Sequence, residues 1–105
     1  MIKPLLKTYV RKLVLTTMKY RIVYSQDFLK IFKKLDNSVQ RLVASYIKRY
    51  LLDTDNPRQH GKALVGELKG FWRYRIGDYR LIVEIRDNEL IIVVLTFGHR
   101  SAIYE

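Results

Sequence analysis

The feature that most constrains the fold is a pair of alternating runs separated by two turn-forming residues. In residues 72–76 and 79–85, aromatic or aliphatic side chains alternate for the most part with charged ones, and Gly77 and Asp78 stand between the runs. A period of two places successive side chains on opposite faces of a strand. A glycine at the first of two loop positions is typical of a tight hairpin turn. The chain is therefore predicted to contain an antiparallel hairpin with two chemically different faces.

The turn also fixes the register of this hairpin. With a two-residue loop, Ile76 pairs with Tyr79 and Arg75 lies directly opposite Arg80. Arg73 then shares a face with these two arginines, and like charges directly opposite in a sheet cost ~0.2–1 kcal/mol. A bound anion would offset this cost, although arginine stems can also cover a sheet surface without a ligand. The opposite face is predicted to pack against helices and to hold Trp72, Tyr74, Ile76, Tyr79, Leu81 and Val83.

The rest of the chain predicts a single α+β domain. Apolar residues recur at helical spacing in residues 26–35 and 39–51, and Ser25 is a suitable N-cap for the first helix. The order is β-α-α-β-β-β, in which a helical hairpin packs on a twisted, mostly antiparallel sheet. The remaining expected elements are a strand at residues 20–24, a loop at 53–62, a second tight turn at Asp87-Asn88 and a strand at 90–95 that is buried on both faces.

The charge balance points to a polyanionic partner. The chain has 105 residues, with 20 Lys and Arg against 10 Asp and Glu, and a formal net charge of +10. Such a domain suits nucleic acid, an acidic protein or a membrane surface. The absence of cysteine excludes disulfides, and no glycine-rich phosphate loop or metal-ligand spacing supports nucleotide-triphosphate or metal chemistry. The longest apolar run, residues 90–95, is too short to cross a bilayer.

Residues 1–17 differ from the remainder of the chain. They carry four basic residues and no acid, which gives +4, and their apolar residues could share one helical face. Met18 stands directly before the first predicted strand, so a complete domain could begin there. We therefore expect residues 1–17 to be a basic extension outside the globular fold, without the features of a signal peptide, and residues 18–105 to form one domain.

A second candidate cluster lies near the end of the chain. His99 and Arg100 follow Gly98, directly after the strand that neighbours the arginine-bearing one. An unperturbed histidine has a pKa of ~6.5 and can transfer protons near neutrality. If the chain is an enzyme, the side chains available for catalysis are arginine, tyrosine and histidine. These suit phosphodiester cleavage in RNA, where the 2′-hydroxyl of the substrate is the nucleophile and neither a metal nor another cofactor is needed.

Two stretches of the sequence resemble a known family. Residues 68–81 and residues 98–104 resemble the RelE/ParE superfamily of toxins from toxin–antitoxin systems, and the similarity extends from Met18 to the end. The closing segment looks more like the RelE branch, which cleaves mRNA on the ribosome, than the ParE branch, which poisons DNA gyrase. The resemblance implies a RelE-like fold. The residues that carry it are Arg73-Tyr74-Arg75-Ile76-Gly77-Asp78-Tyr79-Arg80, Gly98-His99-Arg100 and Tyr104.

The resemblance implies catalytic roles for three residues. Arg80 falls on the catalytic arginine of the family, and Arg100 on a second arginine that contacts phosphate. Tyr104 corresponds to the C-terminal tyrosine that stacks on the substrate base and assists proton transfer. Together these side chains would neutralise the scissile phosphate and stabilise the charge that develops in the transition state.

Two further arginines raise the question of which residue acts as the general base. Arg73 and Arg75 stand where RelE proteins place basic residues, often lysine, around the scissile phosphate. Arginine stays protonated and is a poor base. The acid and base roles would then fall on His99, at a position that is basic in the relatives, and on Tyr104. The candidate catalytic residues are thus Arg80, His99, Arg100 and Tyr104, with Arg73 and Arg75 binding RNA phosphate and no metal.

The resemblance also implies partners. RelE-type toxins are held inactive by a small acidic antitoxin, so a hetero-oligomer with a RelB-like antitoxin is expected. The substrate would be mRNA in the ribosomal A site, and no membrane partner is expected. Three alternatives stay open: a ParE-like toxin that inhibits gyrase through protein contact, a basic nucleic-acid-binding module without chemistry, and an inactive homologue. A ParE-like toxin would not need His99 or Tyr104, and a binding module would cleave no RNA.

Overall fold

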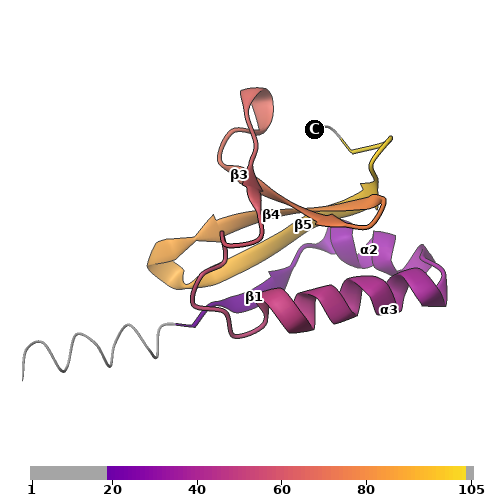
Figure 1. The fold of residues 1–105 in the computed structure, drawn as a ribbon, viewed down its shortest axis with the longest axis horizontal. Helices are drawn as coiled ribbons and strands as arrows, with labels where there is room; N and C mark the ends of the chain where they lie inside the picture. Colours follow the sequence, from indigo (N-terminus) through magenta and orange to yellow (C-terminus); the bar gives the residue numbers. More distant parts are fainter. Residues whose placement is uncertain (1–18, 104–105) are drawn as a thin grey trace, which may run out of the picture.

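A twisted sheet with two helices against one of its faces forms the body of the protein (Figure 1). The computed structural model describes residues 19–103. In this part of the chain the sheet has five strands in the order β1-β5-β4-β3-β2. The predicted α+β class, with a helical hairpin on the sheet, is confirmed. In chain order the elements are β1 (Arg21–Tyr24), α2 (Gln26–Lys34), α3 (Asn37–Tyr46) followed by a π-helical turn (Ile47–Leu51), β2 (Lys62–Ala63), β3 (Phe71–Ile76), β4 (Tyr79–Arg86) and β5 (Ile91–His99).

The sheet differs from an antiparallel meander in two ways. β1 lies parallel to β5, with Ile22 opposite Ile92, so the sheet is mixed. β2 adds a short edge strand antiparallel to β3, at the end of the stretch predicted as a loop. In addition, β5 continues to His99, and its fully buried residues Ile92, Val94 and Phe97 all lie on the core face. The expectation of a strand buried on both faces is therefore wrong, because the outer face of β5 is only half-buried.

The predicted hairpin is confirmed in its register. Ile76 pairs with Tyr79, and Arg75 pairs with Arg80, across β3 and β4. Gly77, the first turn residue, has a φ of 59°, in the left-handed region that glycine adopts without steric cost. The face toward the helices belongs to the core, as the alternation predicts, and holds Trp72, Tyr74, Ile76, Tyr79, Leu81 and Val83.

A capping side chain explains where α2 begins. The Ser25 hydroxyl oxygen accepts a hydrogen bond from the Phe28 N–H at 3.0 Å, and the hydroxyl donates to the Leu95 carbonyl at 2.8 Å. The predicted N-cap therefore also ties α2 to β5. Phe28 then enters the same buried core as Val43 of α3 and Ile47 of the π-helical turn.

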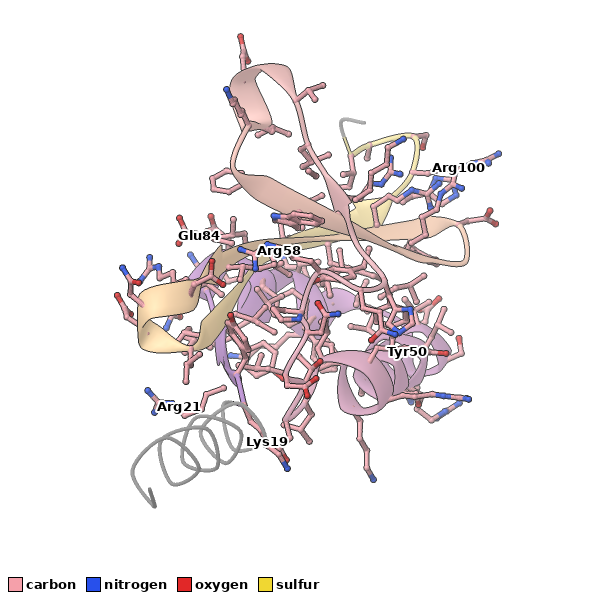
Figure 2. The ribbon with its side chains drawn as sticks, turned by 60° about the vertical axis from the view of Figure 1, so that its left-hand side comes forward. Lys19, Arg21, Tyr50, Arg58, Glu84 and Arg100 are labelled. Carbon is pink, nitrogen blue, oxygen red and sulfur yellow. The ribbon has the colours of Figure 1, made fainter. Side chains whose placement is uncertain are left out.

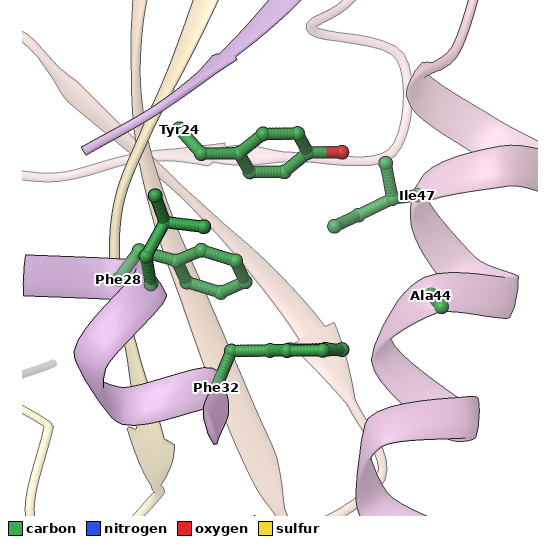
Figure 3. A pocket seen from close by; sticks show the side chains of 6 residues that line it. Tyr24, Phe28, Phe32, Ala44 and Ile47 are labelled. Carbon is green, nitrogen blue, oxygen red and sulfur yellow. The ribbon is translucent and has the colours of Figure 1, made fainter. Parts of the chain in front are cut away.

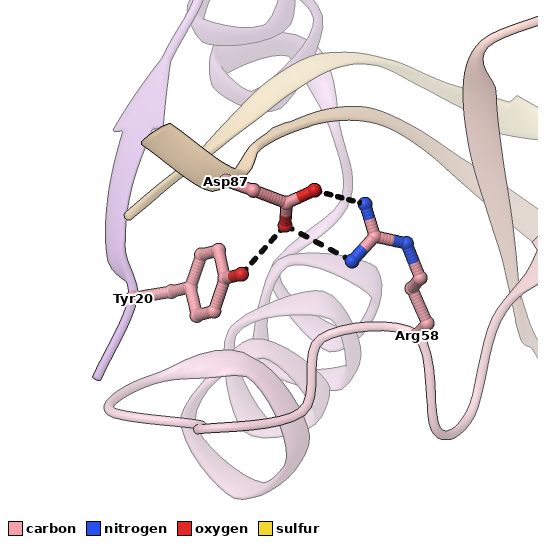
Figure 4. Close-up of polar contacts among 3 residues, drawn as sticks. All are labelled: Tyr20, Arg58 and Asp87. Carbon is pink, nitrogen blue, oxygen red and sulfur yellow. Dashed lines mark hydrogen bonds and ion pairs between the residues drawn. The ribbon is translucent and has the colours of Figure 1, made fainter. Parts of the chain in front are cut away.

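A polar cluster closes the end of the sheet where β4 turns into β5. Asp87 accepts a hydrogen bond from the Tyr20 hydroxyl at 2.6 Å and two from Arg58, at 3.0 and 2.8 Å (Figure 4). The Arg58 guanidinium also lies 5.5 Å from the centre of the Trp72 ring. Hydrogen bonds from Arg58, and next from Tyr20, lower the pKa of Asp87 below its ordinary value. This cluster holds the loop of residues 53–61 against the start of β1.

Replacing Asp87 with Asn is expected to make folding stability less sensitive to acid. Because the Asp87 pKa is lowered in the folded state, its stabilisation is present above the unfolded value of ~3.9 and is lost as the pH falls through the lower folded value. The Asp87 side chain is 54% exposed, so we expect at most about 1 kcal/mol at pH 7. Urea unfolding of both proteins should show a larger difference at pH 7 than at pH 3. A difference that is constant with pH would contradict the ionic origin.

No helix within residues 19–103 combines the length and the apolarity needed to span a membrane. The predicted boundary between residues 1–17 and a domain beginning at Met18 lies outside the described residues, as does the predicted site residue Tyr104.

Candidate functional site

The arginines of the predicted hairpin lie on the sheet face that points away from α2 and α3. We call this surface, defined by Arg73, Arg75 and Arg80 on β3 and β4, the arginine face. Arg75 and Arg80 are directly paired, and Arg73 follows on the same side of β3. Lys62 of β2 pairs with Arg73 and extends the face toward the sheet edge. Sequence reasoning misses Lys62, because a two-residue strand next to a loop carries no alternation signal.

The three arginines differ in burial. Arg75 is exposed, whereas Arg73 is only 8% accessible and Arg80 only 2%. The Nη1 of Arg80 donates to the carbonyl oxygens of Gly77 and Tyr79, at 3.1 and 2.9 Å. Arg80 therefore stabilises the turn that it follows, and a ligand on this face meets the Arg75 side chain first.

Arg100 is held next to the same turn. Its backbone N–H donates to the carbonyl oxygen of Asp78 at 2.8 Å, and its side chain is exposed. In Figure 2, Arg100 lies at one end of the molecule, and Glu84 and Arg21 lie toward the other. Among residues 19–103, neither Arg75 nor Arg100 forms an ion pair. Two exposed guanidinium groups available to an anion therefore flank one hairpin turn.

The acidic side chains of the hairpin lie mainly at the other end of the sheet. Glu84 accepts a hydrogen bond from Arg86 at 2.6 Å, and Asp87 belongs to the polar cluster described above. Arg80 and Arg86 are about 20 Å apart along β4, at 3.3–3.4 Å per residue. At the β3–β4 turn the nearby acid in the sequence is the exposed Asp78. The side chains that form ion pairs thus lie at one end of the sheet, and the excess positive charge lies at the other end, near the β3–β4 turn.

The C-terminal turn, residues 100–103, returns over the arginine face. The Ile103 N–H donates to the His99 carbonyl at 3.1 Å. The Ile103 side chain then covers Gly98, the β5 partner of Arg80, because a Cβ at Gly98 would lie 3.1 Å from two Ile103 carbons. Gly98 thus leaves the space that Ile103 occupies. The residue before Tyr104 is fixed on the arginine face by this contact.

His99 lies on the opposite face from the arginines. It pairs with Tyr79 at the end of β5, and the two rings meet edge to face at 5.7 Å. Its Nδ1 accepts a hydrogen bond from the Ser101 N–H at 3.2 Å and lies 2.9 Å from the Ser101 hydroxyl. Because a backbone N–H can only donate, Nδ1 carries no proton here and Nε2 holds the ring proton of the neutral form. The structure therefore ties His99 to the C-terminal turn and does not place it beside Arg75.

A separate apolar pocket opens between α2 and α3, on the helical side of the molecule. Tyr24, Phe28, Phe32, Ala44 and Ile47 line a cavity of about 230 Å³ (Figure 3). The rings of Tyr24 and Phe28 stack at 5.5 Å, and burial raises the pKa of Tyr24. The described lining holds no charged side chain. This pocket therefore suits an apolar group of a partner better than a phosphate.

Two solved structures share this fold. A chain of the toxin–antitoxin complex RelBE2 from Mycobacterium tuberculosis matches with a TM-score of 0.70 at 28% identity, over 78% of this chain and 99% of that chain. The isolated Escherichia coli RelE toxin shares the fold, with a TM-score of 0.62 at 19% identity, over 76% of this chain and 83% of that chain. The protein therefore has the α+β fold of the RelE toxins.

Sequence comparison then gives the family. Residues 22–104 match the model of the ParE toxin of type II toxin–antitoxin systems, parDE. A RelE-like toxin protein of Escherichia coli is 31% identical over 86 residues, which cover 80% of this chain and 86% of that protein. Toxin RelE of Mycobacterium tuberculosis is 26% identical over 85 residues, or 81% of this chain and 86% of that protein. The chain belongs to the RelE/ParE superfamily of toxins from type II toxin–antitoxin systems, as the motif resemblance predicts.

Proposed function

We propose that this toxin is an endoribonuclease of the RelE type that cleaves mRNA in the ribosomal A site. The observation that carries this function is the position of Arg75 and Arg100. Both are exposed beside one hairpin turn, and neither is paired with a carboxylate among residues 19–103. Relatives that bear the RelE name support the same activity.

For this reaction the site must hold one phosphate and stabilise the negative charge that develops on it. When the 2′-oxygen attacks the adjacent phosphorus, an O2′–P bond forms and the P–O5′ bond breaks. The products are a 2′,3′-cyclic phosphate and a 5′-hydroxyl. Negative charge grows on the phosphoryl oxygens in the pentacoordinate transition state. Arg75 and Arg100 would bind these oxygens through charge-assisted hydrogen bonds, and Arg73 and Arg80 would add positive potential from beneath.

Residues near the end of the chain would carry out the two proton transfers that the reaction needs. A base must take the 2′-proton, and an acid must give one to the leaving 5′-oxygen. We assign Tyr104 to the reacting atoms, as the resemblance to RelE toxins implies, and the residue before it, Ile103, lies on the arginine face. His99 lies at the end of β5 with its Nδ1 occupied by Ser101. The neutral ring cannot give up its Nε2 proton without forming an imidazolate, so His99 could act as the acid only after a proton replaces the Ser101 N–H at Nδ1. In the structure its bond to Ser101 positions the C-terminal turn.

A basic toxin of this family needs a partner that keeps it inactive. We propose an acidic, RelB-like antitoxin in a hetero-oligomer with this chain. Structures of RelB–RelE complexes from other organisms share the fold. The apolar pocket between α2 and α3 suits the apolar side of an amphipathic helix, and the exposed Lys30, Lys33 and Lys34 of α2 suit its acidic side.

A second candidate function follows from the family model, which carries the ParE name. A ParE-like toxin would act on DNA gyrase through protein contact and would leave mRNA uncut. Such a toxin would not depend on His99 or Tyr104. A basic binding module without chemistry would also leave mRNA uncut, but would bind RNA in a salt-dependent manner.

Induction of the protein in growing cells, followed by mapping of mRNA 5′ ends, tests the ribonuclease function. New 5′-hydroxyl ends are expected inside coding regions, at a fixed position relative to the reading frame, and they should disappear when translation is blocked beforehand. Tyr104→Ala should remove most of them. Growth arrest with intact mRNA and a loss of DNA supercoiling would instead establish the ParE-like activity.

A further inference from the structure

A second concavity lies on the arginine face itself. It occupies about 320 Å³ between the start of α2, the strands β3 to β5 and the C-terminal turn. Phe71, Ile82, Thr96 and Ile103 form much of its wall, and Asp27 also lines it. We call this concavity the hollow. Its mostly apolar wall with a few polar groups is the usual character of a ligand site.

The hollow adjoins the proposed phosphate site. Ile82 pairs with Arg73 on one side and with Thr96 on the other. The pair of Arg75 and Arg80 lies two residues further along the same strands and on the same face, which is about 6.6–6.8 Å away. This spacing is comparable with the separation between the phosphate and the base of one nucleotide. An RNA strand whose phosphate contacts Arg75 can therefore place a base over Ile82.

Among the described residues, one charged side chain lines the hollow, and it is available to a ligand. The Ser25 hydroxyl is occupied, because it caps α2 and donates to the Leu95 carbonyl. Asp27, in the first turn of α2, is exposed and forms no hydrogen bond or ion pair through its carboxylate within residues 19–103. A carboxylate repels phosphate. The position of Asp27 beside the proposed phosphate site therefore favours a ligand group that presents only hydrogen-bond donors to the carboxylate.

We propose that the hollow binds a guanine base of the RNA and that Asp27 recognises it. This inference rests on the proposed ribonuclease function, because the base would belong to the cleaved strand. The Watson–Crick edge of guanine presents N1–H and N2–H side by side, and one carboxylate can accept both. Phe71 and Ile82 would pack against the guanine ring, in the way that apolar side chains pack against single-stranded bases in other RNA sites.

The other bases match Asp27 less well. Adenine and cytosine each offer one amino group next to an unprotonated ring nitrogen, which would face the second carboxylate oxygen. Uracil offers one N–H between two carbonyl oxygens. A good bidentate pair discriminates against the wrong base by roughly tenfold or more. Asp27 would therefore give the enzyme a preference for guanine at one position beside the cut.

Sequencing of the cleaved mRNA ends from cells that express wild-type protein or Asp27→Asn tests this assignment. We expect guanine to be enriched at one position beside the cut in the wild type. In Asp27→Asn the enrichment should fall about tenfold while cutting continues, because asparagine offers one donor and one acceptor. Asp36→Asn is the matched control. It removes the same charge at the start of α3, where Asp36 makes no side-chain capping bond, and should keep the wild-type profile.

A second arm uses purified ribosomes and an mRNA in which inosine replaces that guanosine. Inosine lacks the N2 amino group, so the wild type should cut the inosine mRNA about tenfold more slowly than the guanosine mRNA. Asp27→Asn should cut the two mRNAs at nearly equal rates. An unchanged base profile in Asp27→Asn, or an equal loss at every sequence, would overturn guanine recognition and leave the ribonuclease function standing. Guanine recognition would also be overturned if the only effect of Asp27→Asn were weaker antitoxin binding. No cleavage by the wild type in either arm would overturn both proposals.

Discussion

Replacing Arg75 and Arg100 together with alanine is expected to lower the yield of cleaved mRNA ends by at least about a hundredfold. Both side chains are exposed beside the β3–β4 turn and are unpaired within residues 19–103. They would bind the phosphate most strongly when its charge is greatest, in the transition state, and contribute little to the fold. Because such surface changes alter stability by only about 0.5 kcal/mol, the double variant should unfold at nearly the wild-type temperature.

Arg21→Ala is the matched control for this experiment. Arg21 is an exposed strand residue of the same sheet, and it pairs with Ile91 at the end opposite the β3–β4 turn. Mapping of mRNA ends should find this variant as active as the wild type. If Arg21→Ala lost as much cleavage as the single variant Arg75→Ala, the arginines would act by general attraction to RNA and not through a defined site. Full activity of the Arg75 and Arg100 double variant would show that the scissile phosphate does not bind at this turn.

Arg80, which the family resemblance assigns to catalysis, is a less informative position to mutate. Its side chain is 2% exposed and donates to the carbonyls of Gly77 and Tyr79. Alanine would remove a buried stem and both bonds, at a cost of about 2 kcal/mol or more in the free energy of unfolding. An inactive Arg80→Ala protein would therefore not distinguish a catalytic arginine from one that holds the turn. The exposed Arg75 avoids this ambiguity.

The hairpin shows what the sequence alone can predict here. The turn length sets the pairing of Arg75 with Arg80, and the alternation divides the hairpin into a core face and an arginine face, both of which the structure confirms. The burial of Arg80 could not be predicted in the same way. Ile103 covers Gly98, the β5 partner of Arg80, and reaches this face through a short turn at the end of the chain. A fold-back of this kind leaves no periodic signal in the sequence.

His99 shows where reasoning from strand alternation fails. The register of β4 and β5 shifts between Ile82 and Val83, and Leu95 is left as an extra residue in β5. Without this bulge, strict alternation from the β4–β5 turn would put His99 on the arginine face. With it, His99 faces Tyr79 on the other side of the sheet. Neither glycine nor proline adjoins Leu95, so the sequence does not mark the bulge.

Gly98→Val is expected to reduce cleavage by about a hundredfold with little change in stability. A Cβ at Gly98 would lie 3.1 Å from both Cδ1 and Cγ1 of Ile103, and the two methyl groups of valine need more room still. Since β5 is a strand, valine suits its backbone, and the strain falls on the C-terminal turn. Displacement of Ile103 would move the chain that leads to Tyr104. A shift of about 1 Å in a reacting group can cost about a hundredfold in rate.

The double variant Gly98→Val with Ile103→Ala separates a misplaced turn from a damaged sheet. Removing the Ile103 side chain makes room for valine, so part of the lost cleavage should return, whereas damage to β5 would persist. Ile103→Ala alone measures what the side chain itself contributes. Mapping of mRNA ends and thermal unfolding of the three variants give both readouts. If Gly98→Val cuts mRNA as well as the wild type, the contact between Gly98 and Ile103 is not what positions the proton-transferring group. The chemistry would then depend on Arg75 and Arg100 and not on the position of Ile103.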